Sequence, residues 1–389
     1  MRSYKMVELG TLIHPTKYVR CGDGEYPVLS MTMHDGLVFQ DDKFKKVIAS
    51  KDRSGYKVVY RNQLVISFPI DEGVLAAQRI VDAGIVSPAY GIWDIDQTQV
   101  LPEFLEYSLR CERALDYYKA KLRGSTARRR SLPTPTLLAF SVPLPEIKEQ
   151  QQILEIIHHV KATCGLRQQE LQKLDDLVKA RFIELFGTYP NNPMGWETGT
   201  IRDIVADVRY GSSRPAVEGG KYPYLRMNNI TYGGELDLTD TKRIDVPAED
   251  LPKCTVRRGD VLFNRTNSRE LVGKTCVYNR DEMMVLAGFV VRVRVNEYML
   301  PEFLSAFMNT DASKRMLLGR CKTAIGQANI NAQELQNIAI YIPPIELQKE
   351  FVAFKAQTDK SKFSLKNGGK EAAIAVKYIW ESLCRGTLA

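Results

Sequence analysis

Two loops of this chain share a frame of basic and small polar residues but differ at their tips. The first reads RGSTARRR over residues 123–130, and the second reads RCKTAIGQ over residues 320–327 and continues as ANIN. Arginine can donate two hydrogen bonds to guanine O6 and N7 or bind a phosphate, whereas asparagine and glutamine can bridge adenine N6 and N7. A shared frame with exchanged tips is what two readers of different base sequences need.

A structural alternative exists for each of these segments. Arg128–Arg130 can be a solvated run of charge, and the asparagines can belong to turns. The same choice applies to the polar segments 209–213, 226–229 and 264–268. The recurrence of the loop frame at matched positions favours base reading. The candidate DNA-contacting residues are Arg123, Ser125, Thr126, Arg128, Arg129, Arg130, Arg209, Tyr210, Ser212, Arg226, Asn228, Asn229, Asn264, Arg265, Thr266, Lys322, Thr323, Gln327, Asn329 and Asn331.

The elements that must position these loops are repeated along the chain. Several short motifs return in the same order and at nearly constant separation, which indicates one unit duplicated in tandem. A repeat of this length can bury a core of its own. The matched segments are YPVL (26–29) with YPYL (222–225), LPEFL (101–105) with LPEFL (300–304), and Pro143 and Pro145 with Pro343 and Pro344.

The repeat predicts a mixed α/β (α+β) fold with two similar domains, residues 1–145 and 188–343, each followed by a long helix. In segment 146–187, apolar residues recur in steps of three and four, which is a heptad pattern. The second helix is expected over 344–389, with a break at Gly368-Gly369, because two glycines cost about 2 kcal/mol in a helix interior. We expect the helices to pair as an antiparallel coiled coil.

Composition narrows the class of protein. The net charge of +8 favours a polyanionic partner. The seven cysteines are scattered singly, which argues against a disulfide scaffold and a zinc site. The sequence contains neither GxxxxGK[ST] nor GxGxxG, so we expect no nucleotide cofactor, no metal and no catalytic residue of its own. Without an apolar leader or a run of membrane-span length, we expect a cytoplasmic protein.

These features together resemble the specificity (S) subunit of type I restriction–modification systems, and the resemblance covers nearly the whole chain. It rests on TAIGQANIN (323–331), IAIYIPP (338–344) with Leu347-Gln348, and PLP (143–145) with Glu149-Gln150-Gln151. The first copy departs from the family pattern, because it has the arginine run where the second has Gly-Gln-Ala-Asn-Ile-Asn.

The resemblance implies a non-catalytic subunit in which each recognition domain reads one half of a split double-stranded DNA target. It implies that the paired helices set the separation and dock two methyltransferase (M) subunits, which carry S-adenosylmethionine and modify adenine. Restriction (R) subunits can join that complex. Two other hypotheses remain open from the residues: a self-contained methyltransferase or nuclease with an unrecognised site, and an interaction protein with two adhesive domains.

Overall fold

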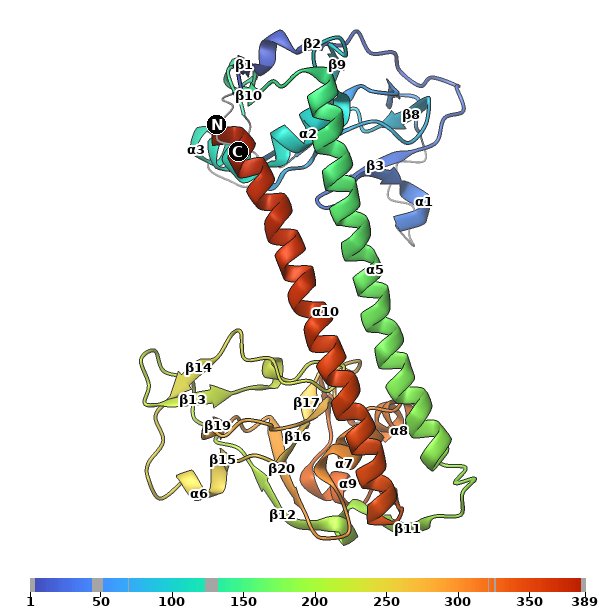
Figure 1. Cartoon of the computed structure of the whole chain (residues 1–389), viewed down its shortest axis with the longest axis vertical. Coiled ribbons are helices and arrows are strands. Elements are labelled where there is room, and N and C mark those ends of the chain that lie inside the picture. The colour runs from blue at the N-terminus through green and yellow to red at the C-terminus, as the bar shows by residue number, and fades with distance from the viewer. Residues whose placement is uncertain are drawn as a thin grey trace. The chain divides into compact units, whose positions relative to one another are not determined.

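The computed structural model describes residues 4–43, 52–68, 70–122, 132–320, 322–324 and 327–385. The chain divides into two compact units (Figure 1). The first unit comprises residues 1–168 together with 366–389, and the second comprises residues 169–365. Each long helix therefore contributes residues to both units.

The first unit is built from short strands and short helices. Pro102 is the first residue of α2 and follows Leu101. Proline has no N–H to donate, and it is tolerated there because the N–H groups of a first helical turn have no partner within the helix. The elements are β1 (Met6–Glu8), β2 (Ile13–Pro15), β3 (Leu29–Thr32), β4 (Gly36–Phe39), α1 (Gln40–Lys43), β5 (Lys57–Tyr60), β6 (Leu64–Ile66), β7 (Leu75–Ala77), β8 (Ala83–Val86), β9 (Gly91–Ile95), α2 (Pro102–Arg110), α3 (Glu112–Lys121), α4 (Thr134–Leu138), β10 (Ser141–Pro143) and α5 (Ile147–Phe186), with 3-10 turns η1 (Leu9–Thr11) and η2 (Ile70–Glu72).

The main sheet of the first unit has the order β2-β9-β6-β7, and all of its pairings are antiparallel. Its core combines strand residues with one side of α2, including Phe104 and Leu105. Ile157 of α5 and Leu383 of α10 belong to the same core. Burial of this surface holds both long helices against the domain, because apolar burial contributes about 25 cal/mol per Å².

The second unit repeats this scheme, with longer strands in part of its main sheet: β12 and β20 have six residues each, whereas β2 has three and β9 has five. Its first strand, β11, pairs with β23 as β1 pairs with β10. The elements are β11 (Glu197–Thr200), β12 (Val205–Tyr210), β13 (Tyr222–Leu225), β14 (Lys242–Ile244), α6 (Leu251–Cys254), β15 (Thr255–Val256), β16 (Val261–Asn264), β17 (Thr266–Asn267), β18 (Thr275–Val277), β19 (Met284–Leu286), β20 (Val290–Val295), α7 (Pro301–Met308), α8 (Asp311–Arg320), β21 (Lys322–Ala324), β22 (Gln327–Asn329), α9 (Ala332–Gln336), β23 (Ala339–Ile342) and α10 (Ile345–Arg385), with 3-10 turns η4 (Ile201–Ile204) and η5 (Met227–Asn229).

Besides the β11–β23 pair, the described residues of the second unit form three sheets. The main sheet, β12-β20-β16-β18, is antiparallel and has the connectivity of the main sheet in the first unit. A second sheet has the order β14-β13-β19-β15. A third has the order β17-β22-β21, and its strand β17 follows β16 directly in the chain (Figure 1). The main core includes Val291 and Val293 of β20, which alternate with arginines as a two-residue strand period requires.

A buried glutamine joins each domain to the start of its long helix in the same way. In the first unit, Gln150 accepts from Leu101 N at 2.8 Å and donates to Gln99 O at 2.9 Å and Pro145 O at 2.8 Å. In the second, Gln348 accepts from Leu300 N at 2.8 Å and donates to Tyr298 O and Pro343 O at 3.0 and 2.8 Å. The duplicated motifs of the sequence thus build one duplicated hydrogen-bond pattern.

Within the second unit, α5 and α10 run antiparallel. The ring of Phe182 lies 5.3 Å from that of Phe351, and Asp175 lies 2.6 Å from Lys362, so residue numbers rise along α5 as they fall along α10. The predicted fold class, two similar α/β domains with long paired helices, is confirmed.

The predicted break in the second helix is wrong. The backbone of α10 is a continuous helix over Ile345–Arg385, through Gly368 and its neighbour. The glycine cost of about 2 kcal/mol is small beside the packing that holds both ends of a long helix. No helix in the described ranges combines the length and apolar character needed to cross a membrane.

Candidate nucleic-acid interface

The sheet β17-β22-β21 brings together two candidate segments that are far apart in the sequence. Thr266 pairs with Asn329, and Asn267 pairs with Ala328. The backbone continues this pairing, because Ile330 N donates to Arg265 O at 2.9 Å. Two of the polar segments singled out in the sequence therefore form one surface.

Tyr210 adds a third candidate segment to this surface. It ends β12, and its hydroxyl accepts a hydrogen bond from Ala332 N at 2.9 Å. The guanidinium carbon of Arg265 lies 5.0 Å from the centre of the Tyr210 ring, within the range of a cation–π contact. The tyrosine is exposed but is held at its hydroxyl and at its ring, so it presents a fixed aromatic group.

Arg265 carries a charge that no carboxylate neutralises within the described residues. Its Nη1 donates to Gly288 O at 3.4 Å, and its buried Nε has no hydrogen-bond partner among the atoms described. The other two candidate arginines of this unit are paired: Arg209 lies 2.9 Å from Asp207, and Arg226 lies 2.8 Å from Asp240. Arg265 is therefore the candidate best able to bind a phosphate or a guanine edge.

Asp207 forms ion pairs with two arginines, one of which precedes Tyr210 in β12. It lies 2.6 Å from Arg292 and 2.9 Å from Arg209. Burial acts to raise the pKa of the Asp207 carboxyl, but hydrogen bonds from these two arginines outweigh burial and leave that pKa below its ordinary value. The carboxylate stays ionised at neutral pH and holds Arg209 beside Tyr210.

The turn between β19 and β20 completes the surface with a residue that the sequence reasoning missed. Arg265 N donates to Phe289 O at 3.0 Å, and Gly288 N donates to Ser212 O at 2.8 Å. Phe289 is 55% exposed, although aromatic side chains are usually buried. Its signal in the sequence was a lone aromatic after Ala287-Gly288, at the start of a valine-rich strand. Ser212 lies against this turn, and its hydroxyl accepts from Arg214 N at 3.2 Å.

Three candidate asparagines have roles inside the fold. Asn229 is buried, accepts from Arg226 N and donates to Asp237 O at 2.8 Å. Asn264 is buried and accepts from Thr266 N at 3.2 Å. Asn331 caps α9 by accepting from the backbone of its first turn. Burial leaves Asn229 and Asn264 out of reach of a base, so for these two the turn interpretation replaces base reading.

The remaining candidates are distributed as follows. Arg226 and the exposed Asn228 follow β13, which is about 40 residues before β17 in the sequence. Thr266 is buried. The side chains of Lys322, Thr323 and Gln327 lie outside the described part of the structure, although their backbones form β21 and β22. Outside the described residues altogether lie Arg123, Ser125, Thr126, Arg128, Arg129 and Arg130.

The first unit presents a different side chain at the equivalent strand end. β6 holds the place in its sheet that β16 holds in the second unit. After β6 come Ser67 and Phe68, where β16 is followed by Arg265, and Phe68 is 58% exposed. The two domains thus share a frame and expose different chemistry at its edge.

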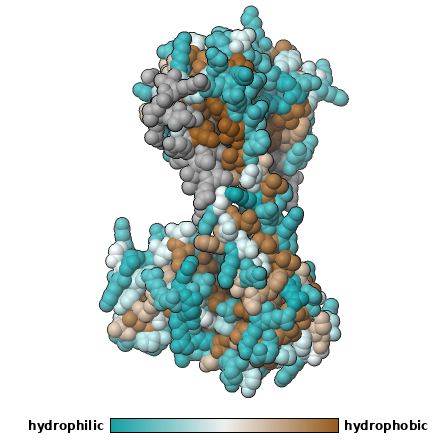
Figure 2. All heavy atoms as spheres, viewed as in Figure 1, coloured by the Kyte–Doolittle hydropathy of each residue, from teal (hydrophilic) through white to brown (hydrophobic). Residues whose placement is uncertain are grey.

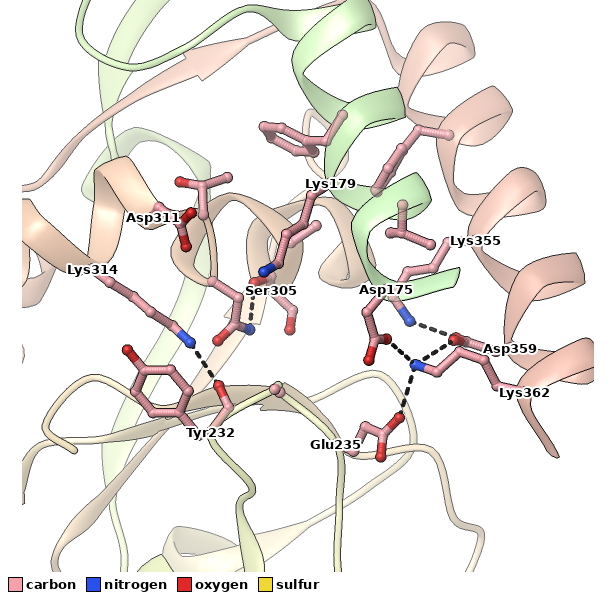
Figure 3. A pocket seen from close by; sticks show the side chains of 18 of the residues that line it. Asp175, Lys179, Tyr232, Glu235, Ser305, Asp311, Lys314, Lys355, Asp359 and Lys362 are labelled. Atoms are coloured by element: carbon pink, nitrogen blue, oxygen red, sulfur yellow. Dashed lines mark hydrogen bonds and ion pairs between the residues drawn. The ribbon is translucent and has the colours of Figure 1, made fainter. Parts of the chain in front are cut away.

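The second unit also contains a pocket of about 290 Å³ between its helices and its domain (Figure 3). Lys314 lines it, donates to Tyr232 O at 2.6 Å and stands 3.5 Å from the centre of the Tyr232 ring. Burial, with help from the charge of nearby Lys179, lowers the pKa of Lys314 to about 8. The described residues contain no cluster of His, Cys, Asp and Glu suited to a metal ion.

The lowered pKa of Lys314 predicts a pH-dependent stability. Between about pH 8 and the ordinary lysine value, the unfolded chain binds a proton that the folded chain does not, so stability rises with pH. Lys314→Met is expected to lack this rise. Denaturant unfolding of both proteins at about pH 7 and about pH 9.5 measures it. Equal pH dependence in the two proteins would contradict the assignment to Lys314.

Comparison with known proteins shows which families and structures this chain is similar to. Residues 193–375 match the family of type I restriction modification DNA specificity domains. A putative type I restriction enzyme specificity subunit from Methanocaldococcus jannaschii is 28% identical over 171 residues, which cover 43% of this chain and 40% of that relative. The alignment thus spans about two fifths of the relative's length. The resemblance to specificity subunits noted in the sequence is confirmed.

Solved structures share the fold over almost the full chain. A chain from a study of complex assembly and conformational transition of the type I R-M system matches with a TM-score of 0.60 and 18% identity, covering 99% of this chain and 98% of that one. The S subunit of a type I restriction–modification system from M. genitalium matches with a TM-score of 0.52 and 13% identity, covering 98% and 96%. At these identities the likeness establishes the fold.

Proposed function

We propose, because residues 193–375 match the family of type I restriction modification DNA specificity domains, that the chain is a DNA-reading specificity subunit of a type I restriction–modification complex. Its role is to recognise a bipartite double-stranded DNA target and to direct methyltransferase and restriction subunits to it. We propose that it has no catalytic activity of its own.

The observation that carries this proposal is the surface formed by Tyr210, Arg265 and Phe289. Three segments supply these residues, and hydrogen bonds between the segments fix them. The unneutralised guanidinium of Arg265 can bind guanine O6 and N7 with two hydrogen bonds or bind a phosphate. Phe289 can pack on a base or enter between base steps, as exposed aromatics do in DNA-binding proteins. Such a surface suits nucleic acid better than a small apolar ligand.

The duplication supports the proposal of a bipartite target. The recognition domains, proposed as 1–145 and 188–343, share a fold but expose Phe68 and Arg265 at equivalent strand ends. Different tips give the two halves different base preferences. The arginine run Arg128–Arg130 and the loop through Gln327, Asn329 and Asn331 remain proposed contacts of the first and second half-site.

The long helices and the net charge support the proposed partners. We propose that α5 and α10 set the separation of the half-sites and dock two methyltransferase subunits, which hold S-adenosylmethionine. The net charge of +8 suits a DNA partner. In Figure 2, hydrophilic side chains are interspersed with hydrophobic ones on the visible face of the second unit, as at a water-facing surface. We propose a cytoplasmic complex, which restriction subunits can join.

Methylation mapping tests this function. The chain is expressed with its methyltransferase partner in a host that lacks adenine methylation, and modified adenines are located by sequencing. We expect methylation at one bipartite motif and none without the chain. Random methylation by an intact complex would contradict the proposal. Methylation or cleavage of DNA by the purified chain alone would favour the alternative, a self-contained methyltransferase or nuclease.

A further inference from the structure

A nearly buried ammonium group joins three segments of the second unit. Lys362 Nζ of α10 lies 2.6 Å from Asp175 of α5, 3.1 Å from Glu235 and 3.6 Å from Asp359 of α10. Glu235 belongs to the loop between β13 and β14 of the domain. The Lys362 side chain is 11% exposed, and Figure 3 shows it among the three carboxylates. One cation therefore connects both helices to the domain.

This cluster is more than a surface ion pair. The lysine is largely withdrawn from solvent, whereas the side chains of Asp175, Glu235 and Asp359 are 46%, 47% and 42% exposed. The cation is thus held between three carboxylates that reach it from the surface. Burial acts to lower the pKa of Lys362, but the hydrogen bonds that its ammonium group donates to Asp175 and Glu235 outweigh burial and raise that pKa. The lysine is charged at neutral pH, and the neighbouring Lys355 is paired with Asp359 at 2.5 Å.

The long helices and the second domain also share an aromatic contact, and we call the region that contains both contacts the joint. The ring of Phe182 of α5 lies 5.4 Å from that of Phe303 of α7 and 5.3 Å from that of Phe351 of α10, and all three belong to one core. The 290 Å³ pocket is lined both by these two helix phenylalanines and by Lys362 and Glu235. Apolar packing does not fill this part of the joint. Without the Lys362 ion pairs, the phenylalanine contact alone would hold this part of the joint.

We propose that Lys362 is a positioning residue that sets the spacing tolerated between the two half-sites, an inference that rests on the function proposed above. Both helices continue into the first unit. The tilt of the second domain on them therefore fixes the direction in which its reading surface faces. One base pair moves a half-site by about 3.4 Å and turns it by about 34–36°. If the joint is rigid, the complex binds poorly to a target whose spacer differs by one base pair. If the joint is loosened, the complex binds such a target nearly as well.

The experiment compares Lys362→Met with wild type on a library of bipartite targets whose spacers differ by one or two base pairs. Methylation by the complex with its methyltransferase partner is the readout. Wild type is expected to prefer one spacing by at least about tenfold, equivalent to about 1.4 kcal/mol. Lys362→Met is expected to accept adjacent spacings within about threefold while reading the same bases in each half, because the contacts to DNA are unchanged.

Matched variants make the result specific. Lys355→Met removes a lysine from the same helix and pocket, but its partner Asp359 lies on the same helix, so spacing preference is expected to stay as in wild type. Lys362→Arg can still reach the carboxylates and is expected to restore the preference. If Lys362→Met fails to fold, Glu235→Gln tests the same link, because it weakens the bond to the domain and leaves Asp175 and Asp359 in place.

Two results overturn the inference. The first is an unchanged spacing preference in a folded Lys362→Met complex, or in Glu235→Gln if Lys362→Met does not fold. That result would show that Lys362 does not position the domain, and it would leave the proposed function intact. Absence of any bipartite target for wild type overturns the proposed function and this inference with it.

Discussion

Replacing Arg265 by alanine is expected to weaken recognition of one half-site and leave the other unchanged. Arg265 has no carboxylate partner among the described residues, so its guanidinium is available to DNA, and a good bidentate contact to a base contributes about 1–3 kcal/mol of discrimination. We expect affinity for the cognate motif to fall about 5- to 150-fold and one base position to become degenerate. Competition binding on targets substituted at each position measures both effects.

Two further variants serve as a control and as a test of whether Arg265 contacts a base or a phosphate. Arg258→Ala removes an exposed arginine from the opposite end of β16, where Asp281 binds it at 2.7 Å, and is expected to bind DNA as wild type does. Arg265→Lys keeps the charge but not the planar fork. It is expected to recover binding without specificity if Arg265 reads a base, and to recover both if Arg265 binds a phosphate. Unchanged binding by Arg265→Ala would remove this surface from the interface.

Replacing Gln348 by leucine is expected to destabilise the second domain strongly. The substitution leaves Leu300 N, Tyr298 O and Pro343 O without the side chain that binds them in the interior. Each unsatisfied buried group costs about 1–3 kcal/mol, so we expect a loss of at least about 3 kcal/mol in the free energy of unfolding. Hydrogen exchange should show the Leu300 amide losing its protection, while the Leu101 amide in the first unit keeps it.

The duplicated hydrogen-bond pattern supplies the controls. Gln150 has the same role in the first unit. Gln150→Leu is therefore expected to remove hydrogen-exchange protection from the Leu101 amide and to leave the Leu300 amide protected. Lys349→Ala changes the exposed neighbour of Gln348 and is expected to have a small effect. Protection of Leu300 that survives in Gln348→Leu would show that the glutamine does not hold this junction.

Much of the fold could be predicted from the sequence because it depends on local patterns repeated twice. Heptad spacing between Ile153 and Leu185 is sufficient to indicate a long helix, and the returning LPEFL motif fixes the start of α2 and α7. The break at Gly368-Gly369 was predicted wrongly for a physical reason. A propensity cost counts local backbone freedom, whereas this helix is held by packing contacts of its two ends with both units.

The candidate site was less predictable because it depends on contacts between distant segments. Residue type singled out Tyr210, Arg265 and Asn329. Only the pairing of β17 with β22 and the hydrogen bond from Ala332 N to the Tyr210 hydroxyl bring their segments together. Burial, which the sequence does not state, separated Asn229 and Asn264 from the surface and turned them into structural residues. Phe289 was missed because an apolar residue beside a valine-rich strand usually belongs to the core.

Selection of DNA from a random pool tests the central claim most directly. The full chain, assembled with its methyltransferase partner, is mixed with random duplexes, and the retained sequences are determined. We predict one motif made of two defined half-sites, with a spacer of fixed length and no base preference between them. Retention without any enriched sequence, or enrichment of a single continuous motif, would contradict the claim that two duplicated domains read two separate parts of one DNA molecule.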